Sequence, residues 1–287
     1  MENKHWTMLR VLLNRYHEGA TESVLEGLPK ESSQKVLEQN IDALDPSKVL
    51  VQPVNKIKQI HYSWFISSLK KLSKNKRALA LSVFPEPQAT KLIEVLNETL
   101  VPLRQSVAIR TFLLNRLYPD FKLPDVLPVD YLPPSELTQL VKMKKAEIIN
   151  LIDFLGLYDL AEEIRHIVDK KLLEKIYRCL SQRKHRFMRI CLHQKEKLIT
   201  QKLQLEHWDG DCQKLGKLLH HRGMVRLGYA LSGQHQDLVW HIVHILDAGR
   251  GNKLTRYYHK SEIPGVSKAL RSQSLAVMHF FKERAKS

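Results

Sequence analysis

Apolar residues recur at intervals of three and four along almost the whole chain, and regular alternation of apolar and polar residues is scarce. Spacings of three and four place apolar residues on one face of an α-helix, whereas half-buried strands need alternation. The pattern therefore predicts an all-α protein. The expected helices span residues 4–17, 20–27, 30–43, 55–72, 74–83, 87–99, 104–117, 135–144, 146–155, 158–167, 170–181, 184–204, 210–221, 224–232, 235–248 and 265–285.

Two stretches of the N-terminal half share one pattern of apolar, proline and charged positions. Residues 24–38 read VLEGLPKESSQKVLE and residues 80–94 read ALSVFPEPQATKLIE, so Pro29 and Pro85 lie 56 positions apart (85 − 29). Proline lacks the N–H that a helix interior needs, but it is tolerated in a first turn. Each proline is expected to end one short helix and help start the next, with Leu28 and Phe84 buried at the corner. Each unit is expected to stack on its neighbours. The pattern is consistent with one unit used twice, but two copies do not establish a repeat, since short proline-marked corners also recur by chance.

Prolines concentrate between residues 118 and 137, at positions 119, 124, 128, 133 and 134. The residue before a proline is disfavoured in the helical conformation, so this segment should be extended. It also carries large apolar side chains, which predicts that it packs along one or both halves. Ser135 is expected to cap the next helix. The expected organisation is an N-terminal helical domain over 1–118, a proline-rich connector over 119–134 and a basic C-terminal helical domain over 135–287.

Glycines suggest further boundaries in the C-terminal half. Gly156 is expected to be a C-cap that ends a helix, giving another helix–turn–helix step. The segment AGRG, residues 248–251, resembles a phosphate-binding loop only in its glycines, because it lacks the spacing and the Lys-Ser/Thr of a P-loop. A C-cap followed by a turn is the preferred interpretation. Together the boundaries predict two helical subdomains made of short helix–turn–helix units.

Composition narrows the class of protein. The 287 residues are 43% apolar and 26% charged, and glycine and proline are scarce, as in an ordinary globular protein. The N-terminus lacks the apolar core of a signal peptide, and no window is apolar enough to span a bilayer. Three cysteines without metal-ligand spacing predict no disulfide framework, which fits a reducing cytoplasm.

The charge is high and uneven. The formal net charge is +16, and residues 165–204 hold twelve Lys or Arg against three Asp or Glu. Such a surface favours an acidic protein, anionic lipid or nucleic acid as partner. On the helix expected at 184–204, a basic stripe could bind a partner, although a solvated helix face in a basic protein is the preferred interpretation. The stripe comprises Arg186, Arg189, His193 and Lys197.

Candidate chemistry is sparse. His241, His244 and Asp247 follow one another at one-turn spacing, which could hold a metal ion or serve a metal-dependent hydrolase. The preferred interpretation is a polar ridge on an otherwise apolar helix, facing solvent or a partner. No Gly-x-Ser-x-Gly, His-Glu-x-x-His or paired-cysteine motif occurs. We therefore expect no catalytic residue, no cofactor and no metal, and a protein that is not an enzyme.

The two proline units resemble the short helical repeats of the flagellar rotor protein FliG, and YDLAEEIRHIVD, residues 158–169, resembles a helix of its middle region. The helical layout with LPVDYLPPSEL at its centre is similar to the SctK class of bacterial type III secretion sorting-platform proteins, in a chlamydia-like form. The resemblance implies a non-enzymatic, cytoplasmic adaptor. It would link a membrane ring to the cytosolic pod and touch the inner membrane only through that complex.

Two function classes therefore remain. The first is a helical adaptor or scaffold whose partners are other protein subunits of a secretion or motor-like assembly. The alternative is an RNA- or DNA-binding helical protein that uses the basic surface of residues 165–204. The two differ in whether partners survive nuclease treatment and in how steeply binding falls with salt.

Overall fold

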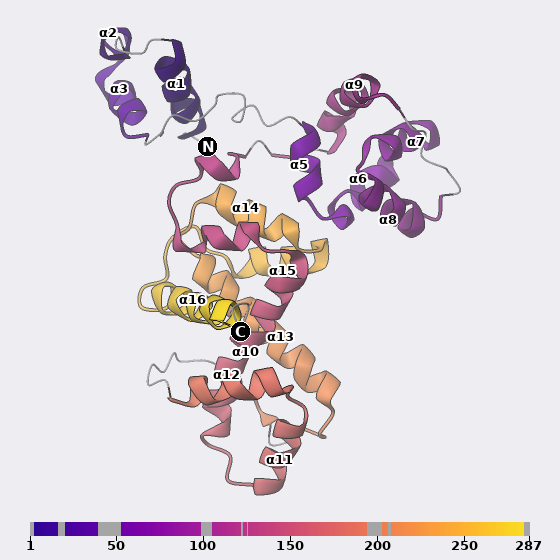
Figure 1. Cartoon of the computed structure of the whole chain (residues 1–287), viewed down its shortest axis with the longest axis vertical. Helices are drawn as coiled ribbons and strands as arrows, with labels where there is room; N and C mark the ends of the chain where they lie inside the picture. Colours follow the sequence, from indigo (N-terminus) through magenta and orange to yellow (C-terminus); the bar gives the residue numbers. More distant parts are fainter. Residues whose placement is uncertain are drawn as a thin grey trace. The chain divides into compact units, whose positions relative to one another are not determined.

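The computed structural model describes residues 3–16, 21–39, 53–98, 105–121, 123, 124, 126–193, 203–205 and 208–283. These residues form helices, turns and irregular segments and contain no strand, so the predicted all-α class is confirmed. The chain divides into two compact units, Met1–Pro133 and Pro134–Ser287, whose helices are labelled in Figure 1. None of the described helices is both long and apolar enough to cross a membrane.

Unit 1 is built from short helices. Its described elements are α1 (Asn3–Tyr16), α2 (Thr21–Leu25), α3 (Lys30–Leu37), α5 (Pro53–Gln59), η1 (Tyr62–Trp64), α6 (Ile66–Lys71), α7 (Lys74–Val83), α8 (Glu86–Leu96), α9 (Val107–Leu117), η2 (Tyr118–Phe121) and η3 (Val129–Tyr131).

The two proline corners have nearly the same backbone. Pro29 precedes α3 with φ −54° and ψ 139°, and Pro85 precedes α8 with φ −53° and ψ 141°. In both, the proline carbonyl accepts hydrogen bonds from the N–H groups three and four residues later. Phe84 is buried as predicted, whereas Leu28 is only half-buried. The prolines therefore start helices at both corners, as the sequence indicated.

Aromatic packing fixes the second corner. Phe65, Phe84 and Phe121 form a cluster of three rings. The centroid distances are 4.8 Å for Phe65–Phe84, 5.4 Å for Phe65–Phe121 and 5.5 Å for Phe84–Phe121. Further along the proline-rich segment, Leu127 and Tyr131 form a buried cluster with Val11 of α1. This segment is therefore packed within unit 1, which extends to Pro133.

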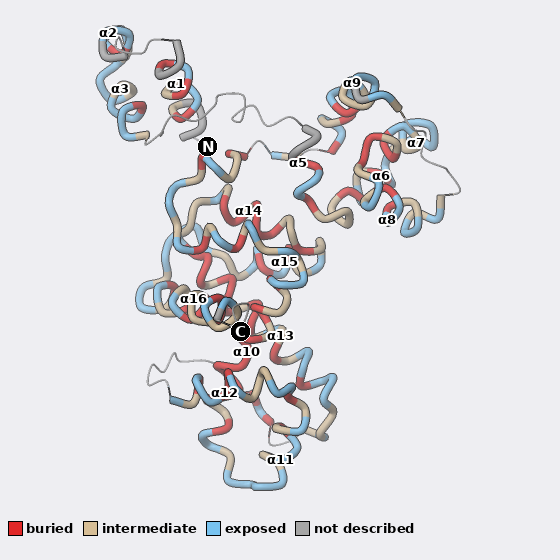
Figure 2. Tube along the Cα trace, in the orientation of Figure 1, coloured by how far each residue is buried: buried red, intermediate tan, exposed pale blue. Residues whose placement is uncertain are grey.

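Unit 2 is built around two 20-residue helices, α10 and α13, that pack closely against each other. Ser135 caps the first element as predicted, its Oγ accepting from the N–H of Leu137 at 3.2 Å, but that element is a 3₁₀ helix. Burial concentrates on α10 and α13, and α11 is largely exposed (Figure 2). The elements are η4 (Glu136–Lys142), α10 (Lys145–Ile164), α11 (Lys170–Arg178), α12 (Gln182–His193), α13 (Cys212–Leu231), α14 (Gln236–Ile245), α15 (Ala248–Tyr257) and α16 (Ser267–Glu283).

The helix breaks expected near Gly156 and Gly223 are wrong. Both glycines lie inside 20-residue helices, α10 and α13, and both are buried. A Cβ on Gly156 would lie 2.1 Å from the carbonyl oxygen of Leu219, and one on Gly223 would lie 1.7 Å from that of Ile152. The glycines therefore let the two helix backbones approach each other. Their role is close packing, and they end no helix.

The expectation of no disulfide is also wrong. Cys179, which caps the C-terminus of α11, is bonded to Cys212, the first residue of α13, with 5.0 Å between their Cα atoms. Two cysteines 33 residues apart show no characteristic spacing, and only the fold brings their Cα atoms within bonding range. Disulfides persist in oxidising surroundings, so cysteine usage gives no support to a reducing compartment.

Candidate binding site

The most basic surface of unit 2 is carried by α11 and α12. Asp169 caps α11, its Oδ1 accepting from the N–H of Lys171 at 2.8 Å, and Ile176 is buried beneath the helix. Between residues 170 and 193 the chain has eight Lys or Arg and one carboxylate, Glu174. We call the exposed cations of this region the basic face: Lys170, Lys171, Lys175, Arg178, Arg186 and Arg189.

Helix α12 is anchored by its apolar side. Phe187, Met188 and Cys191 are buried, and the ring of Phe187 lies 5.4 Å from that of Phe154 on α10. Burial raises the pKa of the Cys191 thiol to about 12, so this cysteine behaves as a packed apolar group. The anchoring fixes which residues of α12 turn outward.

Two of the basic residues of α12 already interact with other side chains of unit 2. The guanidinium of Arg183 stacks 4.6 Å from the ring centroid of Phe281, and the Nζ of Lys184 lies 3.7 Å from Asp153 Oδ2. By contrast, Arg186 and Arg189 are exposed and form no ion pair with any described residue. The unmatched charge of α12 is therefore concentrated at these two guanidinium groups.

Three of the four residues of the predicted basic stripe lie among the described residues. Arg186, Arg189 and His193 are exposed residues of α12, which ends at His193. Lys197 lies outside the described residues. The structure thus places three members of the stripe on one exposed helix, and the fourth stays a prediction.

A hollow of about 390 Å³ opens beside Arg186 and Arg189. Gln182 and His185 complete its described lining, and the four residues occupy positions i, i+3, i+4 and i+7 of α12. His185 Nε2 lies 2.7 Å from the Tyr177 carbonyl oxygen and 3.0 Å from that of Leu180. Because carbonyls only accept, Nε2 carries a hydrogen and the ring is held in place. The lining groups with described positions include no carboxylate.

Gln182 and His185 were not singled out from the sequence, although a signal for them existed. They stand one turn before Arg186 and Arg189 on the same helical face, a spacing that i, i+3, i+4 and i+7 patterning predicts. The shared face of the four residues is therefore local to α12, and only the volume of the hollow required the structure.

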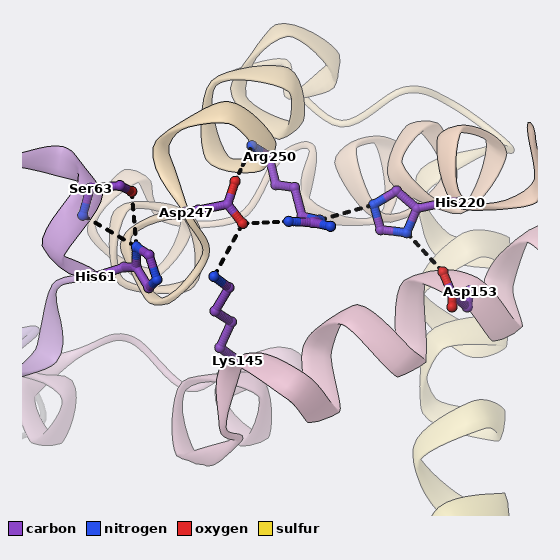
Figure 3. Close-up of polar contacts among 7 residues, drawn as sticks. All are labelled: His61, Ser63, Lys145, Asp153, His220, Asp247 and Arg250. Carbon is purple, nitrogen blue, oxygen red and sulfur yellow. Dashed lines mark hydrogen bonds and ion pairs between the residues drawn. The ribbon is translucent and has the colours of Figure 1, made fainter. Parts of the chain in front are cut away.

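A second polar cluster links α10, α13 and α15 (Figure 3). His220 Nδ1 lies 2.7 Å from Asp153 Oδ1, and the Nε–H of Arg250 donates to His220 Nε2 at 3.2 Å. Asp247 Oδ2 accepts from Arg250 at 2.5 Å and lies 3.3 Å from the Nζ of Lys145. Since a guanidinium only donates, His220 accepts at Nε2 and carries its hydrogen on Nδ1. Both ring nitrogens are engaged, so the cluster ties helices together.

Asp247 opens helix α15. Its Oδ1 accepts from the N–H of Arg250 at 3.1 Å, in the manner of an N-cap. Partial burial by itself would raise the pKa of Asp247, but the hydrogen bonds and positive charge of Arg250, with Lys145, outweigh it and lower the pKa to about 2. The expectation that AGRG forms a C-cap and turn is therefore wrong, because these residues begin α15. An aspartate just before a helix is a recognisable start signal.

Of the two histidines expected on an exposed polar ridge of α14, His241 is buried and His244 is half-buried. His241 is 5% exposed, and His244 stacks on Trp240 with its Nδ1 2.8 Å from the Trp240 carbonyl oxygen. Asp247 lies beyond the end of α14 at Ile245. The ridge is therefore covered at His241, whereas Asp237 and His244 are half-buried. Within the described part of the chain, no three His, Cys, Asp or Glu side chains gather closely enough to hold a metal ion.

In Figure 3, His61 and Ser63 belong to unit 1, where the His61 side chain caps η1. The His61 Nδ1 accepts from the N–H of Ser63 at 3.3 Å and lies 2.9 Å from its Oγ. Both contacts are local to one turn of chain, as in many helix caps.

Comparison of the chain with protein-family models, with curated proteins and with solved structures gave no match.

Proposed function

We propose that this protein is a non-enzymatic helical adaptor whose C-terminal unit binds an anionic partner through the basic face. The observation that carries the proposal is the unmatched charge of that face. Its six Lys and Arg residues form no ion pair with a described residue, although other cations of the unit, such as Arg271 and Lys214, do. An opposing anionic surface would supply the missing partners.

Unit 1 supplies a chemically different surface for a second partner. On α9, Ile109 is 53% exposed and Phe112 is 69% exposed, one turn apart. Exposed aromatic side chains are enriched at protein interfaces. A chain with an apolar surface on one unit and a cationic surface on the other is suited to joining two partners.

The assembly in which the adaptor acts is proposed from the sequence resemblance alone. The SctK-like layout implies a cytoplasmic position between a membrane ring and cytosolic pod subunits of a type III secretion system. The Cys179–Cys212 disulfide is unusual for a cytoplasmic protein, because the cytoplasm keeps most cysteines reduced. Thiol alkylation in intact cells before lysis would show whether the bond exists there.

The test is capture of partners from native lysate with and without nuclease. We expect specific proteins to be retained after nuclease, and to be lost when Lys171, Lys175 and Arg178 are all replaced by Glu. The matched control replaces Lys217, Lys253 and Lys268 by Glu, which changes the net charge equally at exposed sites on α13, α15 and α16. Equal loss in both variants would remove the basic face from the proposal.

A nucleic acid is the second candidate partner, favoured by the density of cations on α11 and α12. Binding of duplex and single strands to the unmodified protein should then weaken steeply with salt, because neutralised phosphates release counterions. The Lys171, Lys175 and Arg178 triple variant should lower the salt slope. Absence of binding at low salt would eliminate this candidate.

A further inference from the structure

We infer that the hollow lined by Gln182, His185, Arg186 and Arg189 is a binding site for a small molecule that carries a phosphate monoester. The inference deepens the proposed function, because it assigns a ligand to one part of the same basic face. It rests on the positions of the four lining residues on α12, the number of donors that Gln182, Arg186 and Arg189 carry, and the volume of the hollow.

The site is held by rigid parts of the fold. The buried side chains of Phe187 and Met188 fix the rotation of α12. His185 is tied to the carbonyls of Tyr177 and Leu180, and the Cys179–Cys212 bond secures the junction between α11 and α12 to the start of α13. A ligand would therefore meet a surface that is formed before it binds, which lowers the entropy cost of binding.

The donors around the hollow exceed what a carboxylate can satisfy. Each guanidinium of Arg186 and Arg189 presents a planar fork of N–H groups, and the amide of Gln182 adds two more. A carboxylate has two oxygens, whereas a phosphate monoester offers three acceptor oxygens and up to two negative charges. Two arginines one turn apart, with no described carboxylate beside them, favour the ligand with more charge.

The size of the hollow favours a small ligand. Its volume of about 390 Å³ falls in the range of about 300–1,000 Å³ that is usual for small-molecule sites. A single phosphate group would leave much of that space empty. We therefore expect a phosphate attached to a compact polar body, such as a phosphorylated sugar, to bind more tightly than inorganic phosphate.

The experiment titrates the full chain with inorganic phosphate, ribose 5-phosphate and ribose, following the guanidinium Nε–H signals by NMR. Saturable chemical-shift changes are expected with inorganic phosphate and ribose 5-phosphate, and none with ribose. Arg186→Gln and Arg189→Gln should each lower the affinity for ribose 5-phosphate at least about tenfold, which is the usual effect of losing one hydrogen bond to a charged group. The matched control, Lys217→Gln with Lys253→Gln, should bind like the unmodified protein.

Three results would overturn the inference: no saturable shift, equal weakening in the control variant, or displacement of ribose 5-phosphate by an acidic peptide at similar concentration. A 5′-phosphorylated oligonucleotide that binds at least tenfold more tightly than ribose 5-phosphate would assign the hollow to a nucleic-acid end instead.

The Lys171, Lys175 and Arg178 triple variant separates the two proposals. It should lose the captured partner and keep ribose 5-phosphate binding, so failure of the adaptor proposal leaves this site independently tested.

Discussion

The sequence predicts helix ends at the proline corners of unit 1 and at Gly156 of unit 2, with a further break between residues 221 and 224, and the structure separates the prolines from the glycines. Pro29 and Pro85 do stand at the starts of α3 and α8. Gly156 and Gly223 lie within α10 and α13, where each faces a backbone carbonyl of the other helix. Both residue types disfavour helices, but the prolines stand at helix ends and the two glycines lie inside helices.

The difference follows from the size of each energetic effect. Proline costs about 3 kcal/mol in a helix interior because it lacks an N–H and clashes with the preceding turn. Glycine costs only about 1 kcal/mol relative to alanine. Close packing of two 20-residue helices can outweigh the smaller cost and cannot easily outweigh the larger one. The four variants below test this contrast, from the largest expected effect to the smallest.

Phe84→Ala should destabilise unit 1 by about 3–5 kcal/mol, the usual cost of truncating a buried aromatic. Phe84 is 3% exposed and contacts two other phenylalanines at the proline corner. Hydrogen exchange by mass spectrometry on the full chain should show faster exchange across α6–α8. Phe112→Ala is the matched control, because Phe112 is 69% exposed. Similar exchange in the two variants would mean that the corner is a surface feature.

Gly223→Ala should cost unit 2 about 3 kcal/mol or more, at or above the usual range for overpacking. The new Cβ would meet a backbone oxygen at 1.7 Å, which can move only if α10 and α13 separate. Gly216→Ala in the same helix is the control, since nothing lies within 4 Å of its added Cβ. It should stabilise the protein by up to about 1 kcal/mol. Urea unfolding would compare them, and an unchanged Gly223→Ala protein would refute the close-packing role.

Asp247→Ala should cost about 1 kcal/mol through loss of the cap that starts α15 at the glycine-rich segment. Asp247→Asn keeps a capping side chain and removes only the charge. Because the folded pKa of Asp247 is lowered from 3.8 to about 2, the carboxylate stabilises the fold above pH 3.8, and this contribution is lost as the pH falls toward 2. The stability difference between the unmodified protein and Asp247→Asn should therefore shrink steeply between pH 3.8 and 2 and vanish below pH 2. A difference that persists there would assign it to something other than the charge.

Pro85→Ala should have the smallest effect, a loss of about 0.4–1 kcal/mol from greater freedom of the unfolded chain. Alanine can adopt φ −53° and ψ 141°, so the corner should survive. Thermal melting measures the loss, and hydrogen exchange should still show α7 and α8 as separate helices. Protection of the amides of residues 84–86 would indicate that the two helices had fused, and that proline alone maintains the corner.

Sequence patterning predicted most helices and part of the candidate site. The helix expected at 74–83 coincides with α7, and the exposed positions of Arg186 and Arg189 follow from helical periodicity. The errors share one cause. The burial of His241 and the Cys179–Cys212 bond both depend on segments that are distant in sequence but adjacent in space. The local sequence around His241, Cys179 and Cys212 does not indicate which distant segments will pack against them.

By itself, the sequence determined the helical class, the proline corners and the concentration of positive charge on α11 and α12. These properties depend on periodicity, on the covalent structure of proline and on side-chain charge, all of which are local. Tertiary structure decided that Gly156 and Gly223 stay helical and that His220 is bonded through both ring nitrogens. Each of these depends on the close approach of separate helices, and the free energy of that packing exceeds the local preferences of single residues.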